Sequence, residues 1–427
     1  MIYAGYIVFL ERGLSLLKRT GLLGFILPHK FFTAKYGESL RALLSGGNHV
    51  AEIVYFGDNQ VFSGATTYTC LLFLNKGGVN EFSLYRVSDI DAWKSQGTAE
   101  KETADNRILT QDTWNFSIRR SSEIISKLEE APLRLGSVAS RIAQGIRTSA
   151  NEVYVLNLVA DNGSCYQVHS KHSGEDFEVE KSISSLFLQG RSIRPFRLVP
   201  PGRVVIIPYR VAADGRGELI PEDEMKEQYP KAYNYLDSCK HYLESREKGR
   251  MRGPQWYGYV YPKNIELMAS RKILVPDIAN RASFAIDEYG QYAFTSGYGI
   301  VLKDFMEEDW KFTLGLLNSS VSDFYLRSVS TMIRGGFFRY FTQYLEGLPI
   351  CSVDSTSGAD KRRRARVIEL VDNMAALFKE VGSANTPDVR TQVERQISVV
   401  NKQIDTLVYE LYRLTDEEIT IIERETS

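Results

Sequence analysis

The chain has 427 residues, of which 43% are hydrophobic and 25% charged, and its formal net charge is -1. This composition excludes wholesale disorder, and the length predicts roughly two to three domains. Because the net charge is close to zero, binding to nucleic acid would have to depend on local clusters of basic residues.

The N-terminal residues and the cysteines both indicate a cytoplasmic protein. The first ten residues are apolar, but Glu11 and Arg12 come next, and neither a basic leader nor a signal-peptide cleavage site is present. The cysteines are too scattered for a disulfide framework and suit a reducing compartment. They are Cys70, Cys165, Cys239 and Cys351. We therefore expect neither secretion nor association with a membrane.

The first segment has the pattern of half an α/β sheet. Apolar spacing predicts a helix over 2–19 with Gly21 as its C-cap, then a buried strand at 22–28 and a helix over 30–44. Further strands are predicted at 51–57, 67–76 and 81–87, the first two as an antiparallel pair. Such a sheet covers only part of its faces, so we expect it to continue into strands outside this chain or to be covered by later segments of the chain.

The loop between the strands at 51–57 and 67–76 contains an aromatic residue without an obvious structural role. In FGDNQVFSGATTYT (56–69), Val61 and Phe62 stand among polar and small residues that are typical of a turn. A ring in a loop gains little from burial when it has no core partner, so hydrophobicity alone does not explain it.

The central part of the chain is predicted to be α+β. Residues 94–107 are polar and end the first segment, and we interpret 94–120 as a linker. A short helix is predicted at 123–130. Short strands separated by turns come next, at 152–158, 203–209, 272–279 and 283–287.

The last part of the chain is predicted to be helical. Apolar spacing indicates one long helix over 307–328. In the tail, apolar residues of 389–414 alternate by four and three, which is the seam of a coiled coil. Pro387 and the capping box TDEE at 415–418 mark two helix starts. We expect the seam to pack on a neighbouring helix or on the central domain, with dimerisation as the alternative.

Most motifs of catalysis are missing. The sequence has no GxGxxG, GxxxxGK[ST] or GxSxG, so neither a nucleotide fingerprint nor a serine nucleophile is indicated. The strings EVEK (178–181) and DEMK (223–226) resemble nuclease motifs but lack an upstream metal aspartate. Zinc is a further alternative, but without a second tight ligand pair we expect no metal. The residues with ligand-like spacing are Cys165, His169, His172, Cys239 and His241.

Arginine placement is more informative. Between positions 191 and 216 there are six arginines and one acidic residue, Asp214. Aromatic residues and glycines accompany arginines in GRSIRPF and MIRGGFFRYF, and they recur in GPQWYGYVYPK. Arginine forks suit phosphate groups and guanine edges. The alternative is a solvated basic face whose aromatic residues point inward, and KRRRAR at 361–366 is typical of a basic helix start.

The first segment contains the stretches YIVFLERGLSLLKRTGLLGFILPHKFF, LRALLSGG and VYFGDNQVFSGATTYTCLLFL. The later part contains, in this order, LGSVASRIAQGIRTSANEVYVL, LQGRSIRPF, WYGYVYP, RKILVPDIA, LGLLNSSVSDFYL and YLEGLPI. Together these stretches resemble the gamma-class adenine-N6 DNA methyltransferases, the TaqI-like family that includes single-chain type II restriction-modification enzymes. The first set is similar to the second half of that family's catalytic domain, and the second set resembles its C-terminal target-recognition domain, which is akin to type I specificity subunits. The tail IDTLVYELYRLTDEEITIIE also matches, so the resemblance covers nearly the full chain.

The resemblance implies roles for two aromatic residues. In the family, an aromatic residue in the loop before the penultimate strand stacks on the target adenine after it has rotated out of the duplex, and QVFSGA places Phe62 there. Rotation costs a few kcal/mol, and stacking returns about 1–3 kcal/mol per base. Phe9 matches the aromatic residue that packs against the adenine of S-adenosylmethionine. For both rings, a plain core position is the alternative.

The chain departs from the family in lacking two motifs. The family's glycine motif for S-adenosylmethionine and its tetrapeptide Asn/Asp-Pro-Pro-Tyr/Phe lie upstream of the first helix, and neither occurs in the 427 residues. We therefore expect that this chain alone transfers no methyl group.

The sequence thus predicts an α/β protein that is the C-terminal portion of an adenine-specific DNA methyltransferase. We expect part of a Rossmann-like sheet at 1–93, the linker at 94–120, an α+β target-recognition domain at 121–355 and a helical tail at 356–427. The expected partners are double-stranded DNA and a separate N-terminal catalytic chain. The arginines expected at DNA are Arg147, Arg191, Arg194, Arg334 and Arg339.

Two other functions are compatible with the sequence. One is a specificity subunit that binds DNA and relies on a partner chain for catalysis. The other is a scaffold without DNA that forms oligomers through its helical tail.

Overall fold

The computed structural model describes residues 5–57, 59–62, 67–87, 89–112, 114, 119–199, 201–213, 215–303, 307–330, 332–333, 336–354, 356–384 and 386–426. It divides into two compact units, residues 1–127 with 327–337 and residues 128–326 with 338–427. The fold is mixed α/β with several sheets and a helical tail, as predicted. Within the described residues, no helix is long and apolar enough to cross a membrane.

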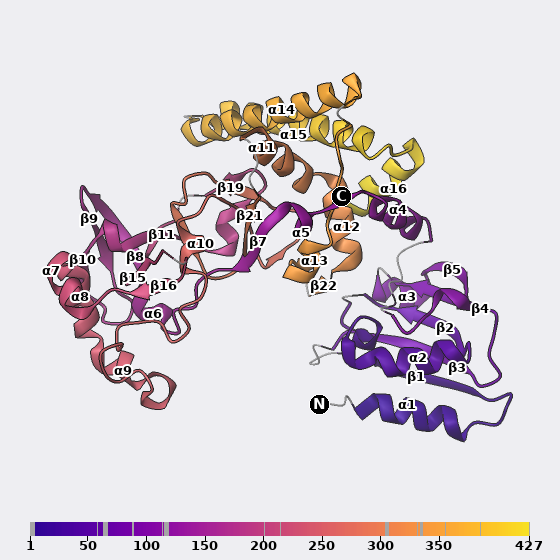
Figure 1. The fold of residues 1–427 in the computed structure, drawn as a ribbon. Coiled ribbons are helices and arrows are strands. Elements are labelled where there is room, and N and C mark those ends of the chain that lie inside the picture. The colour runs from indigo at the N-terminus through magenta and orange to yellow at the C-terminus, as the bar shows by residue number, and fades with distance from the viewer. Residues whose placement is uncertain are drawn as a thin grey trace. The chain divides into compact units, whose positions relative to one another are not determined.

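The first unit is built on a five-stranded sheet in the order β1-β3-β2-β4-β5 (Figure 1). Neighbouring strands are antiparallel except for β2 and β4, which are parallel. The elements are α1 (Gly5–Leu16), β1 (Leu22–Pro28), the 3-10 turns η1 (His29–Phe32) and η2 (Lys35–Gly37), α2 (Glu38–Gly46), β2 (Val50–Tyr55), β3 (Thr69–Asn75), β4 (Glu81–Arg86), α3 (Ile90–Gln96) and β5 (Glu100–Asp105). Helices α1 and α2 share one core with the strands, through Leu10, Leu14, Leu40, Leu44, Ile53 and Leu72.

Strand β1 is not buried as the sequence predicted. It lies at the end of the sheet and, among the described strands, pairs only with β3. Its side chains alternate between exposed and covered, because successive residues point to opposite faces of the sheet. Leu22 is 71% exposed and Ile26 is 43% exposed. An apolar run of this kind indicates burial on both faces, and here one face has no neighbour within the described chain.

The helix predicted over 30–44 begins only at Glu38, after two 3-10 turns. The cause is Arg41, which is 3% exposed and whose Nη1 donates to the carbonyl oxygens of Phe31 (2.5 Å) and Ala34 (2.9 Å). The guanidinium group thus holds the two 3-10 turns, and the Ala34 carbonyl oxygen also accepts from the N–H of Gly37 at 3.0 Å. Burial lowers the pKa of Arg41. Helix α1 also ends early, at Leu16 instead of near Gly21.

The polar residues that begin the predicted linker belong to the first unit, because 94–96 end helix α3 and 100–105 form strand β5. Strand β5 pairs with β4 along its whole length. The fully buried Asn106 then fixes the chain, because its Nδ2 donates to the carbonyl oxygens of Val50 (2.7 Å) and Val79 (3.0 Å). A strand at the end of a sheet needs few apolar side chains, so composition alone did not reveal it.

The second unit contains a six-stranded sheet in the order β10-β9-β8-β14-β11-β20 and a four-stranded sheet in the order β19-β17-β21-β7. Its strands are β6 (Leu133–Arg134), β7 (Ala139–Gln144), β8 (Val155–Asn162), β9 (Cys165–His169), β10 (Asp176–Glu180), β11 (Ser184–Leu188), β12 (Ile193–Arg194), β13 (Arg197–Leu198), β14 (Arg203–Ile206), β15 (Tyr209–Val211), β16 (Gly217–Leu219), β17 (Lys272–Val275), β18 (Ile278–Ala279), β19 (Ala285–Asp287), β20 (Tyr292–Phe294), β21 (Tyr298–Leu302) and β24 (Pro349–Ile350).

The helices of this unit are α5 (Leu135–Val138), α6 (Asn151–Tyr154), α7 (Glu222–Gln228), α8 (Pro230–Ser238), α9 (Lys240–Gly249), α10 (Ile265–Met268), α11 (Glu307–Leu317), α13 (Thr342–Glu346), α14 (Gly358–Ser383), α15 (Pro387–Leu411) and α16 (Asp416–Thr426). Three elements cross the boundaries of the units along the chain: α4 (Arg119–Glu129), α12 (Ser320–Val329) and β23 (Phe337–Arg339); β22 (Met332–Ile333) belongs to the first unit. The predicted α+β character of the central part is confirmed, although the strand expected at 152–158 begins only at Val155.

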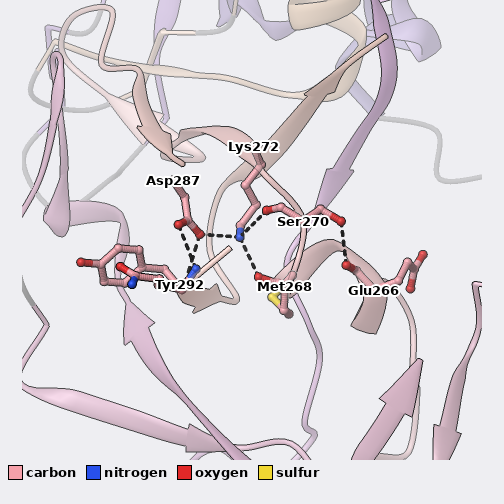
Figure 2. A network of polar contacts seen from close by, with 7 residues as sticks. Glu266, Met268, Ser270, Lys272, Asp287 and Tyr292 are labelled. Carbon is pink, nitrogen blue, oxygen red and sulfur yellow. Dashed lines mark hydrogen bonds and ion pairs between the residues drawn. The ribbon is translucent and has the colours of Figure 1, made fainter. Parts of the chain in front are cut away.

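A buried ion pair joins two strands of the four-stranded sheet (Figure 2). Lys272 on β17 and Asp287 on β19 are both almost fully buried, and Nζ lies 2.6 Å from Oδ2. Nζ also donates to the carbonyl oxygens of Met268 (2.8 Å) and Ser270 (3.2 Å). Burial lowers the pKa of Lys272, and the attraction of Asp287 opposes that change.

The long helix predicted over 307–328 is two helices, α11 and α12, with a break at Asn318 and Ser319. The Asn318 side chain accepts from the N–H of Phe284 and donates to its carbonyl oxygen, both at 2.9 Å. Asp405 on α15 caps the second helix, because its Oδ1 accepts from the N–H of Ser320 at 2.7 Å. The break therefore depends on side chains that are distant in the sequence.

The helical tail matches its prediction closely. Helices α14 and α15 lie side by side (Figure 1), and Val393, Val400 and Ile404 of the predicted seam are buried. Thr386 caps α15, with Pro387 in its first turn. The predicted capping box is formed: the N–H of Thr415 donates to the Glu418 carboxylate (2.7 Å), and the N–H of Glu418 donates to the Thr415 hydroxyl (3.3 Å). The seam thus packs on a neighbouring helix, the first of its predicted partners.

Candidate nucleic-acid interface

The loop that carries Phe62 is anchored to the first unit while the ring itself lies outside. Phe56, directly after β2, is 1% exposed and packs edge-on against Trp93 at 5.0 Å between centroids. Asn59 donates to the carbonyl oxygen of Val87 at 2.9 Å, and Val61 packs on the same apolar cluster. Phe62 is 47% exposed. Within the described chain this ring is therefore not part of the core.

A histidine at the foot of this loop was not predicted from the sequence. His29 directly follows β1, and its N–H donates to the carbonyl oxygen of Tyr68 (3.1 Å), just before β3. Its ring stacks on Tyr55, the last residue of β2, at 4.9 Å. Burial lowers the pKa of His29 to about 4, so the imidazole is neutral at physiological pH, and its buried Nδ1 has no hydrogen-bond partner within the described residues. The position of His29 after a proline that ends a strand was the available signal.

Phe9 also lies outside the core. On α1 the buried residues are Leu10 and Leu14, whereas Phe9 is 70% exposed and Val8 is 54% exposed. Within the described chain Phe9 therefore has no core position, which was the alternative for this residue. An exposed aromatic ring next to an exposed aliphatic side chain is suited to contact with another flat apolar group.

The candidate arginines occupy different environments in the second unit. Arg147 comes shortly after β7 and is exposed, and its Nη2 donates to Oε1 of Gln144 at 2.9 Å. Arg191 and Arg194 are exposed, and neither has an acidic partner within the described part of the chain. Arg339 on β23 lies over the ring of Phe341 at 5.2 Å. Arg334 lies outside the described residues.

Other members of the arginine-rich segment are held by the protein itself. Arg197 lies over the ring of Phe378 at 4.7 Å. Arg210 pairs with Glu218 (3.1 Å) and Glu224 (2.9 Å). These residues are less available to a ligand than Arg191 and Arg194, because part of their hydrogen-bonding or stacking capacity is used internally.

Most aromatic residues of GPQWYGYVYPK point inward, as the alternative interpretation of this stretch predicted. Trp256, Tyr257 and Tyr259 are at most 3% exposed. The hydroxyl of Tyr257 donates to the carbonyl oxygen of Ile220, and burial raises the pKa of Tyr257 to about 12. Tyr261 is the exception, with 42% of its surface exposed.

The residues with metal-ligand spacing have other contacts. His169 lies 2.8 Å from the Asp176 carboxylate, and the rings of His172 and Tyr242 are 4.8 Å apart. Lys231 donates to Sγ of Cys165 at 3.5 Å. Among the residues that the structure describes, no group of three or more histidine, cysteine or acidic side chains could hold a metal ion.

The two nuclease-like strings have structural contacts. Glu178 pairs with Lys231 at 2.5 Å. Both carboxylate oxygens of Glu180 accept from backbone N–H groups at the start of α8, those of Lys231 and Ala232, at 2.9 Å each. In the second string, Lys226 pairs with Glu222 one helical turn away at 2.9 Å. These contacts stabilise helix starts and surfaces and require no metal.

Comparison with known proteins confirms the predicted resemblance. Residues 186–350 match the family model of the TaqI-like C-terminal specificity domain, and residues 3–62 match that of the Eco57I restriction-modification methylase. Over 98% of its length the chain is 27% identical to the type II restriction enzyme and methyltransferase RM.Eco57I of Escherichia coli and covers 43% of that protein. Over 97% of its length it is 23% identical to the type II methyltransferase M.PaeR7I of Pseudomonas aeruginosa and covers 65% of it.

A solved structure has the same fold. The type IIL restriction-modification enzyme MmeI, determined in complex with DNA, matches 99% of this chain with a TM-score of 0.58 and 12% identity, and the match covers 51% of the MmeI chain. The chain therefore spans about half the length of MmeI, and between 43% and 65% of the length of RM.Eco57I and M.PaeR7I.

Proposed function

We propose that this chain, as a relative of type II restriction-modification methyltransferases, is the C-terminal portion of an adenine-specific DNA methyltransferase that recognises double-stranded DNA. The observation that carries this proposal is the match of residues 186–350 to a specificity domain. The exposed arginines Arg147, Arg191 and Arg194 support it, since phosphate contacts provide affinity and base contacts provide specificity. In this assignment, the first sheet, which runs to Asp105, belongs to the end of a Rossmann-like catalytic domain, residues 121–355 recognise DNA and 356–427 form the helical tail.

Phe62 is proposed to stack on an adenine that has rotated out of the duplex. A ring that is 47% exposed, on a loop whose start is anchored by the buried Phe56, offers an apolar face for a base. His29, neutral and stacked on Tyr55 at the foot of that loop, would help to hold the loop in place.

S-Adenosylmethionine is the methyl donor that the relationship implies. Phe9 fits this cofactor in one respect, because its exposed ring can pack against an adenine face. The remaining cofactor contacts and the tetrapeptide that holds the target amino group are missing from this sequence. We therefore propose that the chain alone is inactive and works together with a separate N-terminal catalytic segment.

A specificity subunit without catalysis of its own is the second candidate. The open edge of β1 within the described chain, with the exposed Leu22 and Ile26, favours it, because it offers a surface on which a partner chain could extend the sheet. An oligomeric scaffold is less well supported, since the apolar seam of α15 already packs on α14.

Fluorescence anisotropy with a random-sequence duplex tests the DNA-binding core of this proposal. We expect binding that weakens steeply between about 50 and 200 mM salt, because neutralised phosphates release counterions. Absence of binding at both salt concentrations would contradict the methyltransferase and the specificity-subunit assignments together.

A variant of Phe62 tests the stacking role on the duplex sequence that the chain prefers. Phe62→Ala is expected to weaken binding to that duplex by about 1–3 kcal/mol, the value of one stacked base, while Phe62→Trp retains affinity. Each adenine of the duplex is then replaced by an abasic site. At the target adenine the difference between wild type and Phe62→Ala should vanish, and a difference that persists for every replacement would rule out stacking.

A further inference from the structure

Arg147 lies on a short loop whose backbone is fixed on both sides. Its neighbours Ile146 and Thr148 are both 0% exposed. The N–H of Ile146 donates to the carbonyl oxygen of Phe294 at 2.9 Å, and the hydroxyl of Thr148 donates to Oδ1 of Asn151 at 2.6 Å. The loop therefore presents one exposed side chain between two buried ones.

The guanidinium group of Arg147 is also oriented. Its Nη2 donates to Oε1 of Gln144 (2.9 Å), and Nε2 of Gln144 donates in turn to the hydroxyl of Tyr298 (3.2 Å). Tyr298 is 4% exposed and stands directly opposite Gln144 in the pairing of β21 with β7. Because a guanidinium group can only donate, the Gln144 amide presents its oxygen to Arg147 and its Nε2 to Tyr298, which holds the amide from the neighbouring strand. The other guanidinium N–H groups of Arg147 have no acceptor within the described residues.

A second loop is tied to the same strand end. Tyr261 forms a β-bridge with Arg147, and Nδ2 of Asn264 donates to the carbonyl oxygen of Gln144 at 2.8 Å. Asn264 has a φ of +61°, a strained conformation that the surrounding contacts must maintain. Tyr261, the bridge partner of Arg147, is exposed, and so is Lys263 two residues further along the same loop. The result is a rigid cationic and aromatic surface built from two loops.

Arg191 and Arg194 lack this support. Both are exposed, and within the described part of the chain neither donates a side-chain hydrogen bond. Bidentate recognition of a guanine edge needs a fork held in one orientation, whereas a phosphate contact tolerates a mobile cation.

We propose that Arg147 reads one guanine in the major groove of the recognised sequence, with Gln144 and Tyr298 as positioning residues. Arg191 and Arg194 contact phosphates. This inference depends on the proposed DNA-binding function and adds which side chain supplies base specificity.

Enrichment of binding sequences from a random duplex library tests the inference. Wild type is expected to enrich a motif that contains at least one strongly preferred guanine. Arg147→Lys keeps the charge, so it should bind random duplex with nearly unchanged affinity but lose preference at that one guanine, by roughly 5- to 150-fold. Tyr298→Phe and Gln144→Ala should weaken preference at the same position and leave the other positions unchanged.

The comparison variants separate base reading from charge and from folding. Arg191→Ala should lower affinity for all sequences alike and reduce the salt dependence. Arg395→Ala, an exposed arginine on α15, should change neither. If Arg147→Lys enriches the wild-type motif in full, the inference about Arg147 fails while the proposed function stands. If wild type enriches no motif and binds no duplex, both fail.

Discussion

Replacing Asp287 by alanine is expected to lower the free energy of unfolding of the second unit by about 3–5 kcal/mol, because it leaves a buried charge without its partner. The Lys272 ammonium group would keep two carbonyl acceptors but lose its counter-charge. The N–H groups of Gln291 and Tyr292, which donate to Asp287 at 2.9 and 3.0 Å, would also lose their acceptors. Urea denaturation of wild type and variant measures this difference.

Three further variants test whether the loss of stability results from a buried charge that has lost its partner. Asp287→Asn retains an oxygen acceptor and should cost less than Asp287→Ala. Lys272→Met should also cost less, since Asp287 keeps its two backbone donors. Lys231→Ala removes a pair with Glu178 whose side chains are 46% and 44% exposed, and should cost at most about 1 kcal/mol. A loss for Asp287→Ala no larger than for Lys231→Ala would contradict the expectation.

The stability of the second unit is expected to depend on the ionisation of Asp405. Burial raises the pKa of Asp405 from 3.8 to about 6, against the opposing hydrogen bonds from Ser320. Because the folded pKa lies above the unfolded one, the folded state binds more protons between these values, and stability falls as the pH rises through this window. The shift of about two pKa units corresponds to about 3 kcal/mol.

Asp405→Asn isolates this contribution. The amide oxygen can still accept from the N–H of Ser320, so the cap of α12 is retained. The variant should gain about 3 kcal/mol relative to wild type between about pH 4 and pH 7, as measured by urea denaturation at each pH. Asp388 also lies on α15, at the exposed start of that helix, and Asp388→Asn should show a much smaller change in stability. A difference between Asp405→Asn and wild type that is constant with pH would exclude this role.

Local patterns in the sequence predicted those parts of the fold that local interactions determine. The capping box depends on Thr415 and Glu418 alone, three residues apart, and it is formed as expected. The break between α11 and α12 could not be predicted, because it depends on a carboxylate 85 residues away in the sequence. The late start of α2 likewise results from the burial of one guanidinium group, Arg41, which apolar spacing does not encode.

The residues of the candidate site also fall into two groups, those that the sequence predicted and those that only the fold reveals. The family resemblance selected Phe62 and Arg147, because both belong to short recognisable stretches. The orientation of Arg147 depends on Tyr298, which lies 154 residues from Gln144 in the sequence. His29 was missed because its one signal, a position directly after a strand-ending proline, is weak, and its stacking on Tyr55 is seen only in the structure.

The open edge of β1 has a consequence for handling the protein. Outward-facing N–H and carbonyl groups of an edge strand can hydrogen-bond with any extended peptide, including β1 of another molecule. Leu22 and Ile26 are exposed along it, and before Pro28 at its end the strand has none of the charges and prolines that usually prevent self-association. Purified at high concentration without a covering segment, the protein should tend to aggregate, and a lysine in place of Ile26 should suppress that tendency.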